Sequence, residues 1–347
     1  MTDSFEKQFA GKNILVTGGA GSIGSEIVRQ LLKYNPKTVR VFDSDENGLF
    51  NLQQELCKHQ NVRFLLGDVR EKERVKKAME NIDIVFHAAA LKHVPSCEYN
   101  PFEAIKTNIN GTQNVVEAAL EEEVEKFINI STDKAANPIS TMGATKLLAE
   151  KLVVSANYYK GNRRTILSSV RFGNVIGSRG SVLQVFKQQI RNGGPVTITN
   201  SDMTRFIMSI NQAVNLIFKA TEMAIGGEVF ILKMPVLRLK DLYEVVVEEY
   251  APRYNIDKNK IKIENVGLRA GERVHEHLMR EEEALSALET ENMFIILPQV
   301  QIPDLDDKPY IYPNARKTAV KNYSTKNERV LNKEEIKKML SEEKLLD

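Results

Sequence analysis

The sequence has little net charge and few cysteines. Lys and Arg total 48 and Asp and Glu total 46, so the formal net charge is only +2 over 347 residues. Such a balance creates no field of one sign, and we expect neither nucleic acid nor an anionic membrane surface as a partner. Cys57 and Cys97 lack metal-ligand spacing. They are therefore expected to be free thiols in a reducing compartment.

Long hydrophobic runs are also missing. No apolar window approaches the roughly 20 residues that a membrane-spanning helix needs, and the first residues lack the apolar core of a secretion signal. We therefore expect a cytoplasmic protein without a membrane segment. Hydrophobic residues make up 42% of the chain, enough for the core of one large domain and a smaller one.

A glycine-rich turn follows the first predicted strand, residues 13–17. Gly18, Gly21 and Gly24 come directly after it and lead into a segment with helical spacing of apolar residues. Glycines at these positions permit a tight turn and close approach of the backbone to a pyrophosphate, while the helix N-terminus offers free N–H groups. The pattern predicts a dinucleotide-binding site, with an ordinary glycine-rich turn as the alternative.

The second predicted strand, residues 38–42, indicates which dinucleotide binds. It ends in Asp43, at the distance where a carboxylate meets an adenosine ribose. The charge of Asp43 would repel a 2′-phosphate, so NAD is favoured over NADP. NADP stays open because Ser44 could turn towards a phosphate. Further along, Asp68 follows a third strand and is expected near the adenine edge.

Polar side chains also follow the predicted strand 126–130. Thr132, Asp133 and Lys134 place a hydroxyl, a carboxylate and an amine on consecutive residues, and a helix that begins near Gly143 carries Lys146 back past the same point. Each of these groups would need its own partner in a core. The stretch is therefore either a reactive site at a strand end or a polar turn that caps the strand.

Strands that alternate with helices predict an α/β fold with a doubly wound parallel sheet. From Phe172 the composition changes to a glycine-rich loop. We place a second, smaller substrate-binding domain there. The predicted division is residues 1–172 for the nucleotide-binding domain, to which 207–235 returns, then 173–206 and 236–330 for the second domain, and 331–347 for a charged, solvated terminal helix.

Alternate residues of a helix face different ways, so His275, Glu276 and His277 are not expected to bind metal, and no metal site is predicted.

The motifs of residues 17–24, 87–95, 131–138, 171–182, 203–206 and 269–272 resemble one known family. The first is the Thr-Gly-x-x-Gly-x-x-Gly turn of the extended short-chain dehydrogenases/reductases. The others are more specific and resemble nucleotide-sugar 4,6-dehydratases that act on UDP-N-acetylglucosamine. The resemblance extends from about residue 10 to about residue 330.

One position departs from the family pattern Tyr-x-x-x-Lys. Met142 stands where the tyrosine would take the proton of a substrate hydroxyl, and Lys146 follows at the expected spacing. The same replacement is found in long, membrane-anchored dehydratases that retain the configuration at sugar C5, whereas short soluble enzymes that invert C5 generally keep the tyrosine. The chain thus resembles the catalytic part of the long group without its anchor.

The resemblance implies a role for each site residue. Lys134 would abstract the C5 proton, Asp133 would protonate the departing C6 hydroxyl, and Thr132 would relay the C4 hydroxyl proton in place of a tyrosine. The expected cofactor contacts are Thr17, Gly18, Gly21, Ser22, Ile23, Gly24, Asp43, Ser44, Asp68, Val69, Ala88, Ala89, Ala90, Asn108 and Lys146. The expected substrate contacts are Lys92, Asn174, Ser181, Val182, Arg205, Arg269 and Glu272. The family also implies a homodimer or higher oligomer through helices near 101–121 and 144–159.

Two other kinds of function stay open at this point. Within nucleotide-sugar chemistry, the chain could be a C5-inverting dehydratase or a 4-epimerase. From another class, it could be a catalytically inactive protein that binds NAD and senses nucleotide sugars, since loss of the tyrosine is what such a protein would show. The presence of Thr132, Asp133 and Lys134 together favours an enzyme.

Overall fold

A ten-stranded sheet is the centre of the computed structural model, which describes residues 2–300 and 309–346. Its strands lie in the order β16-β14-β15-β10-β6-β5-β4-β1-β2-β3. The strands from β10 to β3 are parallel, and β15, β14 and β16 add an antiparallel edge. The order 3-2-1-4-5-6 is that of a doubly wound sheet, so the predicted fold class is confirmed.

The strands of this sheet are β1 (Asn13–Thr17), β2 (Thr38–Asp43), β3 (Val62–Leu66), β4 (Ile84–His87), β5 (Lys126–Ile130), β6 (Ile166–Arg171), β10 (Val229–Leu232), β14 (Ala287–Glu289), β15 (Met293–Ile296) and β16 (Arg316–Lys317). β1, β4, β5 and β10 are almost wholly buried, as expected for parallel strands covered on both faces.

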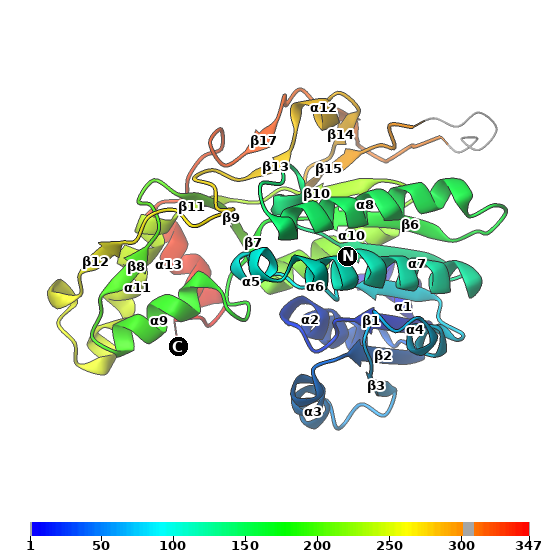
Figure 1. The fold of residues 1–347 in the computed structure, drawn as a ribbon, viewed down its shortest axis with the longest axis horizontal. Coiled ribbons are helices and arrows are strands. Elements are labelled where there is room, and N and C mark those ends of the chain that lie inside the picture. The colour runs from blue at the N-terminus through cyan, green and yellow to red at the C-terminus, as the bar shows by residue number, and fades with distance from the viewer. Residues whose placement is uncertain (1, 301–308, 347) are drawn as a thin grey trace.

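Helices cover both faces of the sheet (Figure 1). One layer holds α1 (Thr2–Phe9), α2 (Ser22–Leu31) and α10 (Ile210–Met223), where Phe5, Phe9 and Phe218 pack together. The other holds α4 (Lys72–Met79), α7 (Gly111–Glu121) and α8 (Thr141–Tyr159), whose apolar faces share a second core cluster. α3 (Glu46–Glu55) follows β2, and α5 (Val94–Tyr99) and α6 (Pro101–Ile105) follow β4.

Local sequence signals explain several helix ends. Ser140 caps α8 by accepting from the Gly143 N–H, and Asp45 caps α3 in the same way through Gly48. Pro101 lies in the first turn of α6. The long helix predicted from Pro101 to Glu121 is interrupted by a π-helical segment, Lys106–Asn110.

A smaller group of elements lies beside the carboxyl ends of the parallel strands, on the left of Figure 1. Its helices α9 (Val182–Arg191), α11 (Leu239–Tyr250) and α13 (Lys333–Glu342) share one hydrophobic cluster. β7 (Asn174–Val175), β9 (Thr204–Met208) and β11 (Val236–Arg238) form a three-stranded sheet. β8 (Val196–Ile198) pairs with β12 (Ile263–Asn265).

A separate pair of strands lies at the top of Figure 1, where β13 (His277–Met279) pairs with β17 (Tyr323–Ser324) and α12 (Glu281–Ala284) follows β13. Leu278, Met279 and Tyr323 pack in the core cluster of the large sheet.

The model differs from the predicted division of the chain in two respects. β14, β15 and β16 lie within residues 236–330, which were predicted to belong to the second domain, but they extend the large sheet. The terminal helix exists as α13, yet it is not fully solvated. Ile336 and Leu340 are buried against α11, because the two apolar residues are one helical turn apart on the face that meets that helix. The other domain boundaries stay predictions.

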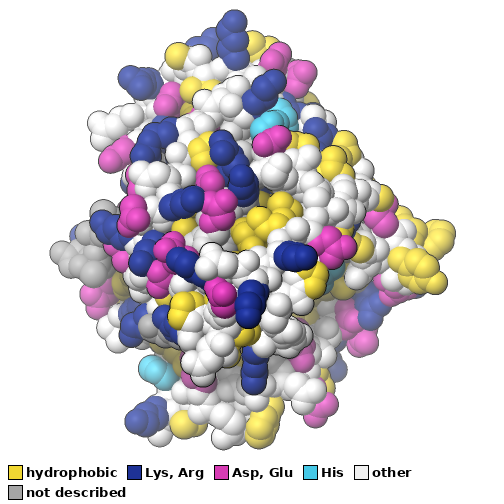
Figure 2. Space-filling view, turned by 90° about the vertical axis from the view of Figure 1, so that its left-hand side faces the viewer, with side chains coloured by type: hydrophobic (Ala, Val, Ile, Leu, Met, Phe, Trp, Pro, Cys, Tyr) yellow, Lys and Arg dark blue, Asp and Glu magenta, His cyan; other side chains and the backbone are white. Residues whose placement is uncertain are grey.

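On the face seen in Figure 2, Lys and Arg are interspersed with Asp and Glu, and neither charge is in strong excess. Among residues 2–300 and 309–346, no helix is both long enough and apolar enough to span a bilayer.

A buried ion cluster joins β6 to the elements around it. Arg171, which is 1% exposed, makes two hydrogen bonds to Glu150 of α8 at 3.0 and 2.6 Å and two to Glu283 of α12 at 3.0 Å. Burial opposes the charge of Glu283, but the Arg171 guanidinium outweighs it and lowers the pKa of that carboxyl. One arginine thereby ties three elements together directly before the loop that begins at Phe172.

We predict that Arg171→Met lowers the free energy of unfolding by about 3–5 kcal/mol, because it leaves two buried carboxylates unpaired. Chemical denaturation measures this change. Arg329→Met is the matched control, since Arg329 is 70% exposed in its pair with Glu335 and the loss there should be about 0–1 kcal/mol. Equal losses in the two variants would show that the buried cluster contributes nothing particular.

Candidate active site

A cavity of about 1050 Å³ lies where the carboxyl ends of the parallel strands meet the smaller group of elements. Strand ends of a parallel sheet meet at one edge, which is where ligands bind in open α/β folds. The glycine turn lines the part of the cavity next to β1 and β2. The segment after β5 lines the middle. The far part is lined by α9, by Arg205 of β9 and by the loop around Arg269.

The glycine turn has the backbone geometry that its sequence predicts. Gly18 has a φ of +65°, and a Cβ there would lie 2.5 Å from the Ala89 nitrogen, so β4 and the turn approach closely only because residue 18 is glycine. A Cβ on Gly24 would lie 2.1 Å from the Gly18 carbonyl oxygen. Gly21 is the N-cap of α2 and offers no side chain to cap it. The first amides of α2 are therefore left for a ligand.

The two predicted adenosine-side carboxylates also line the cavity. Asp43 accepts hydrogen bonds from the Ala20 N–H at 2.9 Å and the Asp45 N–H at 3.0 Å. Asp68 accepts from Arg70 through its backbone and side chain at 2.9 and 2.8 Å. Although burial opposes it, Arg70 lowers the pKa of Asp68. Hydrogen bonds thus hold both side chains at fixed positions on the cavity wall.

Three residues at the end of β5 form a connected array. The Thr132 hydroxyl donates to Asp133 Oδ1 at 2.6 Å, and the Lys134 ammonium donates to both Asp133 oxygens at 3.1 Å. Thr132 and Lys134 line the cavity. The amine, carboxylate and hydroxyl can therefore exchange protons without moving far.

Lys146 and Met142 face the same array from α8. Lys146 donates to the Ile130 carbonyl at 2.7 Å, and burial lowers the pKa of its amine to about 8. Met142 lines the cavity and packs in a small cluster with Cys97 and Ala104. A thioether is at best a weak acceptor, so Met142 cannot take a proton from a substrate.

The predicted substrate contacts also line the cavity: Lys92, Asn174, Ser181, Val182, Arg205, Arg269 and Glu272. The N-terminus of α9 opens there, and the buried Ser181 hydroxyl at its N-cap has no hydrogen-bond partner among the described residues. Lys92 donates to the Arg179 carbonyl at 2.7 Å. Arg269 stays 59% exposed on its side chain, with Glu272 at 4.0 Å.

Three predicted site residues do not line this cavity, which corrects their expected placement. The Thr17 hydroxyl bonds His87 at 2.7 Å, inside the sheet, and burial lowers the pKa of that histidine to about 3. Asn108 lies on the π-helical segment, where its amide holds the backbone of Leu91 and the Thr145 hydroxyl. Asp133 is only 1% exposed on its side chain because Lys134 lies between it and the cavity.

Arg179, which the sequence did not place in the site, lies at the cofactor side of the cavity. Its backbone N–H donates to the Ser22 hydroxyl at 2.9 Å, and its guanidinium bonds the Ala20 carbonyl and Asp45. Ala20 and Ser22 belong to the glycine turn, so the loop after β7 reaches across the chain to the predicted pyrophosphate position. Only the position of this arginine in a glycine-rich loop could have suggested the contact.

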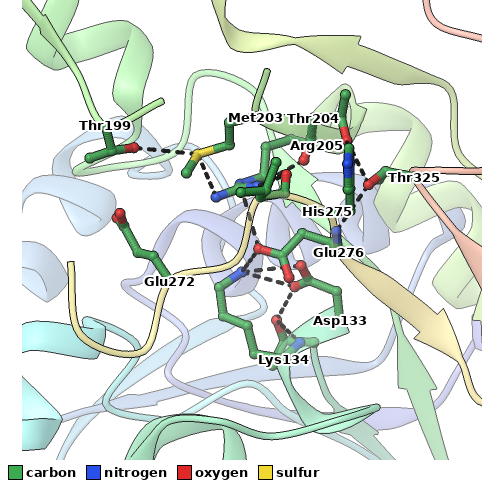
Figure 3. A network of polar contacts seen from close by, with 12 residues as sticks. Asp133, Lys134, Thr199, Met203, Thr204, Arg205, Glu272, His275, Glu276 and Thr325 are labelled. Carbon is green, nitrogen blue, oxygen red and sulfur yellow. Dashed lines mark hydrogen bonds and ion pairs between the residues drawn. The ribbon is translucent and has the colours of Figure 1, made fainter. Parts of the chain in front are cut away.

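Glu276 is a second residue that the sequence did not single out. Figure 3 shows its carboxylate next to Lys134 and Arg205, at 3.8 and 3.5 Å. Burial raises the pKa of Glu276, although Lys134 opposes this. The segment 275–277 leads into the extended strand β13 instead of the helix that was assumed. His275 turns away and bonds the Thr204 hydroxyl at 2.8 Å.

Comparison with known proteins places the chain among sugar-modifying enzymes. An uncharacterized membrane protein from Methanocaldococcus jannaschii is 57% identical over 95% of this chain and 96% of its own length. A UDP-N-acetylglucosamine 4,6-dehydratase (inverting) from Campylobacter jejuni is 43% identical over 85% of this chain and 86% of its own length. The X-ray structure of Pen from Bacillus thuringiensis has a TM-score of 0.89 at 46% identity, covering 96% of this chain and 98% of Pen.

A family model described as polysaccharide biosynthesis protein matches residues 14–298. That range includes the glycine turn, the array after β5 and Glu276. The chain therefore belongs to the polysaccharide biosynthesis protein family, whose members share the extended short-chain dehydrogenase/reductase fold.

Proposed function

We propose that this chain is a UDP-N-acetylglucosamine 4,6-dehydratase that keeps the configuration at C5. The observation that carries the proposal is the array of Thr132, Asp133 and Lys134, which is connected by hydrogen bonds and opens into a cavity large enough for a dinucleotide and a nucleotide sugar. The relative that is a dehydratase supports the reaction class.

NAD is the cofactor that the residues fit. The free amides at the start of α2 suit a pyrophosphate, and the Asp43 carboxylate suits a ribose with free hydroxyls better than one with a 2′-phosphate. Bound NAD would accept hydride from sugar C4 and return it to C6. Lys146 would hold the nicotinamide ribose, and its charge would lower the pKa of nearby hydroxyls.

The proton path follows the hydrogen bonds of the array. The active form has an ionised Asp133 and a neutral Lys134, which arises when the ion pair loses one proton to solvent. As C4 becomes a ketone, its hydroxyl proton passes through Thr132, directly or by way of a water, to Asp133. Lys134 then takes the C5 proton, which the ketone has made acidic.

The second half of the cycle restores the starting state. Protonated Asp133 is no longer held by charge to Lys134, so its side chain is free to turn and donate to the departing C6 hydroxyl. Lys134 returns its proton to C5 while hydride returns to C6. The C4 hydroxyl proton thus ends on the released water, and no outside acid or reductant is needed.

The far part of the cavity suits the nucleotide. The N-terminus of α9, with its unbonded Ser181 hydroxyl, is a site for the diphosphate. Arg205 on β9 and Arg269 on a loop add positive charge to the same wall. We propose that these groups bind the UDP part of the substrate, with Lys92, Asn174, Val182 and Glu272 completing the subsite.

Retention at C5 is proposed from Met142. In the dehydratases that the chain resembles, methionine at this position accompanies retention, and here its side chain leaves proton transfer at C4 to Thr132.

A homodimer is proposed from exposed apolar side chains on α6 and α8. Phe102 is 75%, Leu148 46% and Tyr159 57% exposed, and such a surface marks an interaction site.

The direct test is incubation of the protein with UDP-N-acetylglucosamine and analysis of the product by NMR. We predict a 4-keto-6-deoxy sugar and no steady build-up of reduced nicotinamide, because the hydride removed from C4 returns to C6. Reduced cofactor in proportion to product would show an ordinary dehydrogenase. A galacto sugar formed without loss of water would show an epimerase, and binding of the sugar without turnover would show a sensor.

Thr132→Val tests the relay, since valine keeps the shape and removes the hydroxyl. We predict that the variant binds NAD and UDP-sugar normally but loses turnover by roughly 10²–10⁴-fold, with C4 oxidation as the slowed step. Single-turnover absorbance of reduced nicotinamide measures that step. Near-normal oxidation would show that Thr132 only caps the strand and that solvent takes the C4 proton.

A further inference from the structure

The Lys134 amine lies next to two carboxylates that come from segments far apart in the chain. Asp133 is its neighbour in the chain, and Glu276 comes from the segment that leads into β13. Lys134 lines the main cavity, whereas both carboxylates lie behind it and line only a small adjoining pocket. A substrate in the main cavity would therefore meet the amine and not Glu276.

Glu276 is held firmly from several directions. Its backbone N–H donates to the Thr325 hydroxyl at 2.9 Å, and the Thr325 N–H donates to its carbonyl at 3.0 Å. Its side chain is 6% exposed and lies 3.5 Å from Arg205. The hydrogen bonds fix the backbone of Glu276, and burial beside Arg205 limits where its carboxylate can lie, so it can hold a partner in one orientation.

In the proposed reaction, the position of Glu276 matters when Lys134 takes the C5 proton. When Asp133 is protonated, it can no longer accept from Lys134 with the strength of an ion pair. A neutral amine has one lone pair, which must point at the C5 proton, and at least one of its N–H groups then needs an acceptor. The Glu276 carboxylate lies 3.8 Å from Nζ, at ion-pair distance, on the side away from the cavity. It becomes that acceptor when the amine, released by Asp133, moves the few tenths of an ångström that a hydrogen bond requires.

We propose that Glu276 is a positioning residue that anchors the Lys134 amine and directs its lone pair into the cavity. This inference rests on the proposed dehydratase function. The alternative is that Glu276 serves only as a structural ion pair for Arg205, which would make it important for folding but indifferent to the step at C5.

The charge of Glu276 also sets the proton affinity of the cluster. Burial lowers the pKa of Lys134, but Asp133 and Glu276 outweigh it, so the pKa lies above its ordinary value, while Arg205 opposes them. The charged groups that face Glu276 are Lys134, Asp133, Arg205 and Arg273. Removing the negative charge at position 276 makes every protonated state of the cluster less favourable, so its apparent pKa falls.

Two variants separate the acceptor from the charge. Glu276→Leu removes both, and we predict that turnover falls by up to roughly 100-fold while NAD and UDP binding stay normal. Reduced nicotinamide should then accumulate in single turnovers, because C4 oxidation proceeds and the C5 step is slowed. Glu276→Gln keeps an acceptor oxygen, so it should recover most of the turnover, with the rising limb of its pH profile moved to lower pH.

Glu282→Gln is the matched control, since Glu282 is exposed on α12 and lies away from the cavity. It should leave turnover and pH profile unchanged. Near-normal turnover of Glu276→Leu would overturn the proposal. So would a Glu276→Gln variant with an unmoved pH limb, which stays measurable even if the leucine variant does not fold. A failure of the proposed function would appear separately, as wild-type protein that releases no water from the sugar.

Discussion

The contact of the Lys134 amine with two buried carboxylates is the interaction on which the rest of the site depends. A buried ion is costly unless it is paired and hydrogen-bonded, and Lys134 is paired with both carboxylates. Asp133 follows strand β5 of the large sheet, whereas Glu276 directly precedes β13, far later in the chain. The cluster therefore forms only when the two parts of the chain are packed together, and folding itself assembles the groups that handle protons.

The same dependence is seen on the cofactor side of the cavity. The loop after β7 bonds the glycine turn through Arg179 and is bonded in turn by Lys92. Arg171, buried directly before this loop, ties β6 to α8 and α12. β6, this loop and α9 follow one another along the chain. The Arg171 cluster therefore holds in place both the loop that contacts the glycine turn and the helix whose N-terminus is the proposed diphosphate site. This arrangement fixes the proposed sugar and nicotinamide sites relative to the array after β5.

The sequence predicts site residues best where a short local pattern identifies them. The glycine turn, Asp43 at the end of β2 and the polar residues after β5 all follow from a strand that ends at a predictable place, and the model brings them to one cavity. The sequence does not predict contacts between residues that are far apart in the chain. Nothing near Glu276 in the sequence indicates Lys134, 142 positions earlier. The antiparallel edge of β14, β15 and β16, the buried face of α13 and the placement of Asn108 behind the cavity wall likewise depend on packing that no short pattern encodes.

The stereochemistry at C5 tests the central claim most directly, because it depends on one amine, Lys134, taking and returning a proton on the same face of the sugar. The measurement is NMR of the product formed from UDP-N-acetylglucosamine in D₂O at short reaction times. The account predicts a 4-keto-6-deoxy sugar in the gluco configuration at C5. Deuterium should enter at C5, because in D₂O the neutral Lys134 amine already carries two deuterons when it takes the C5 proton and can return any of the three. A product with the ido configuration at C5 would contradict it and would place the chain with the inverting dehydratases despite Met142.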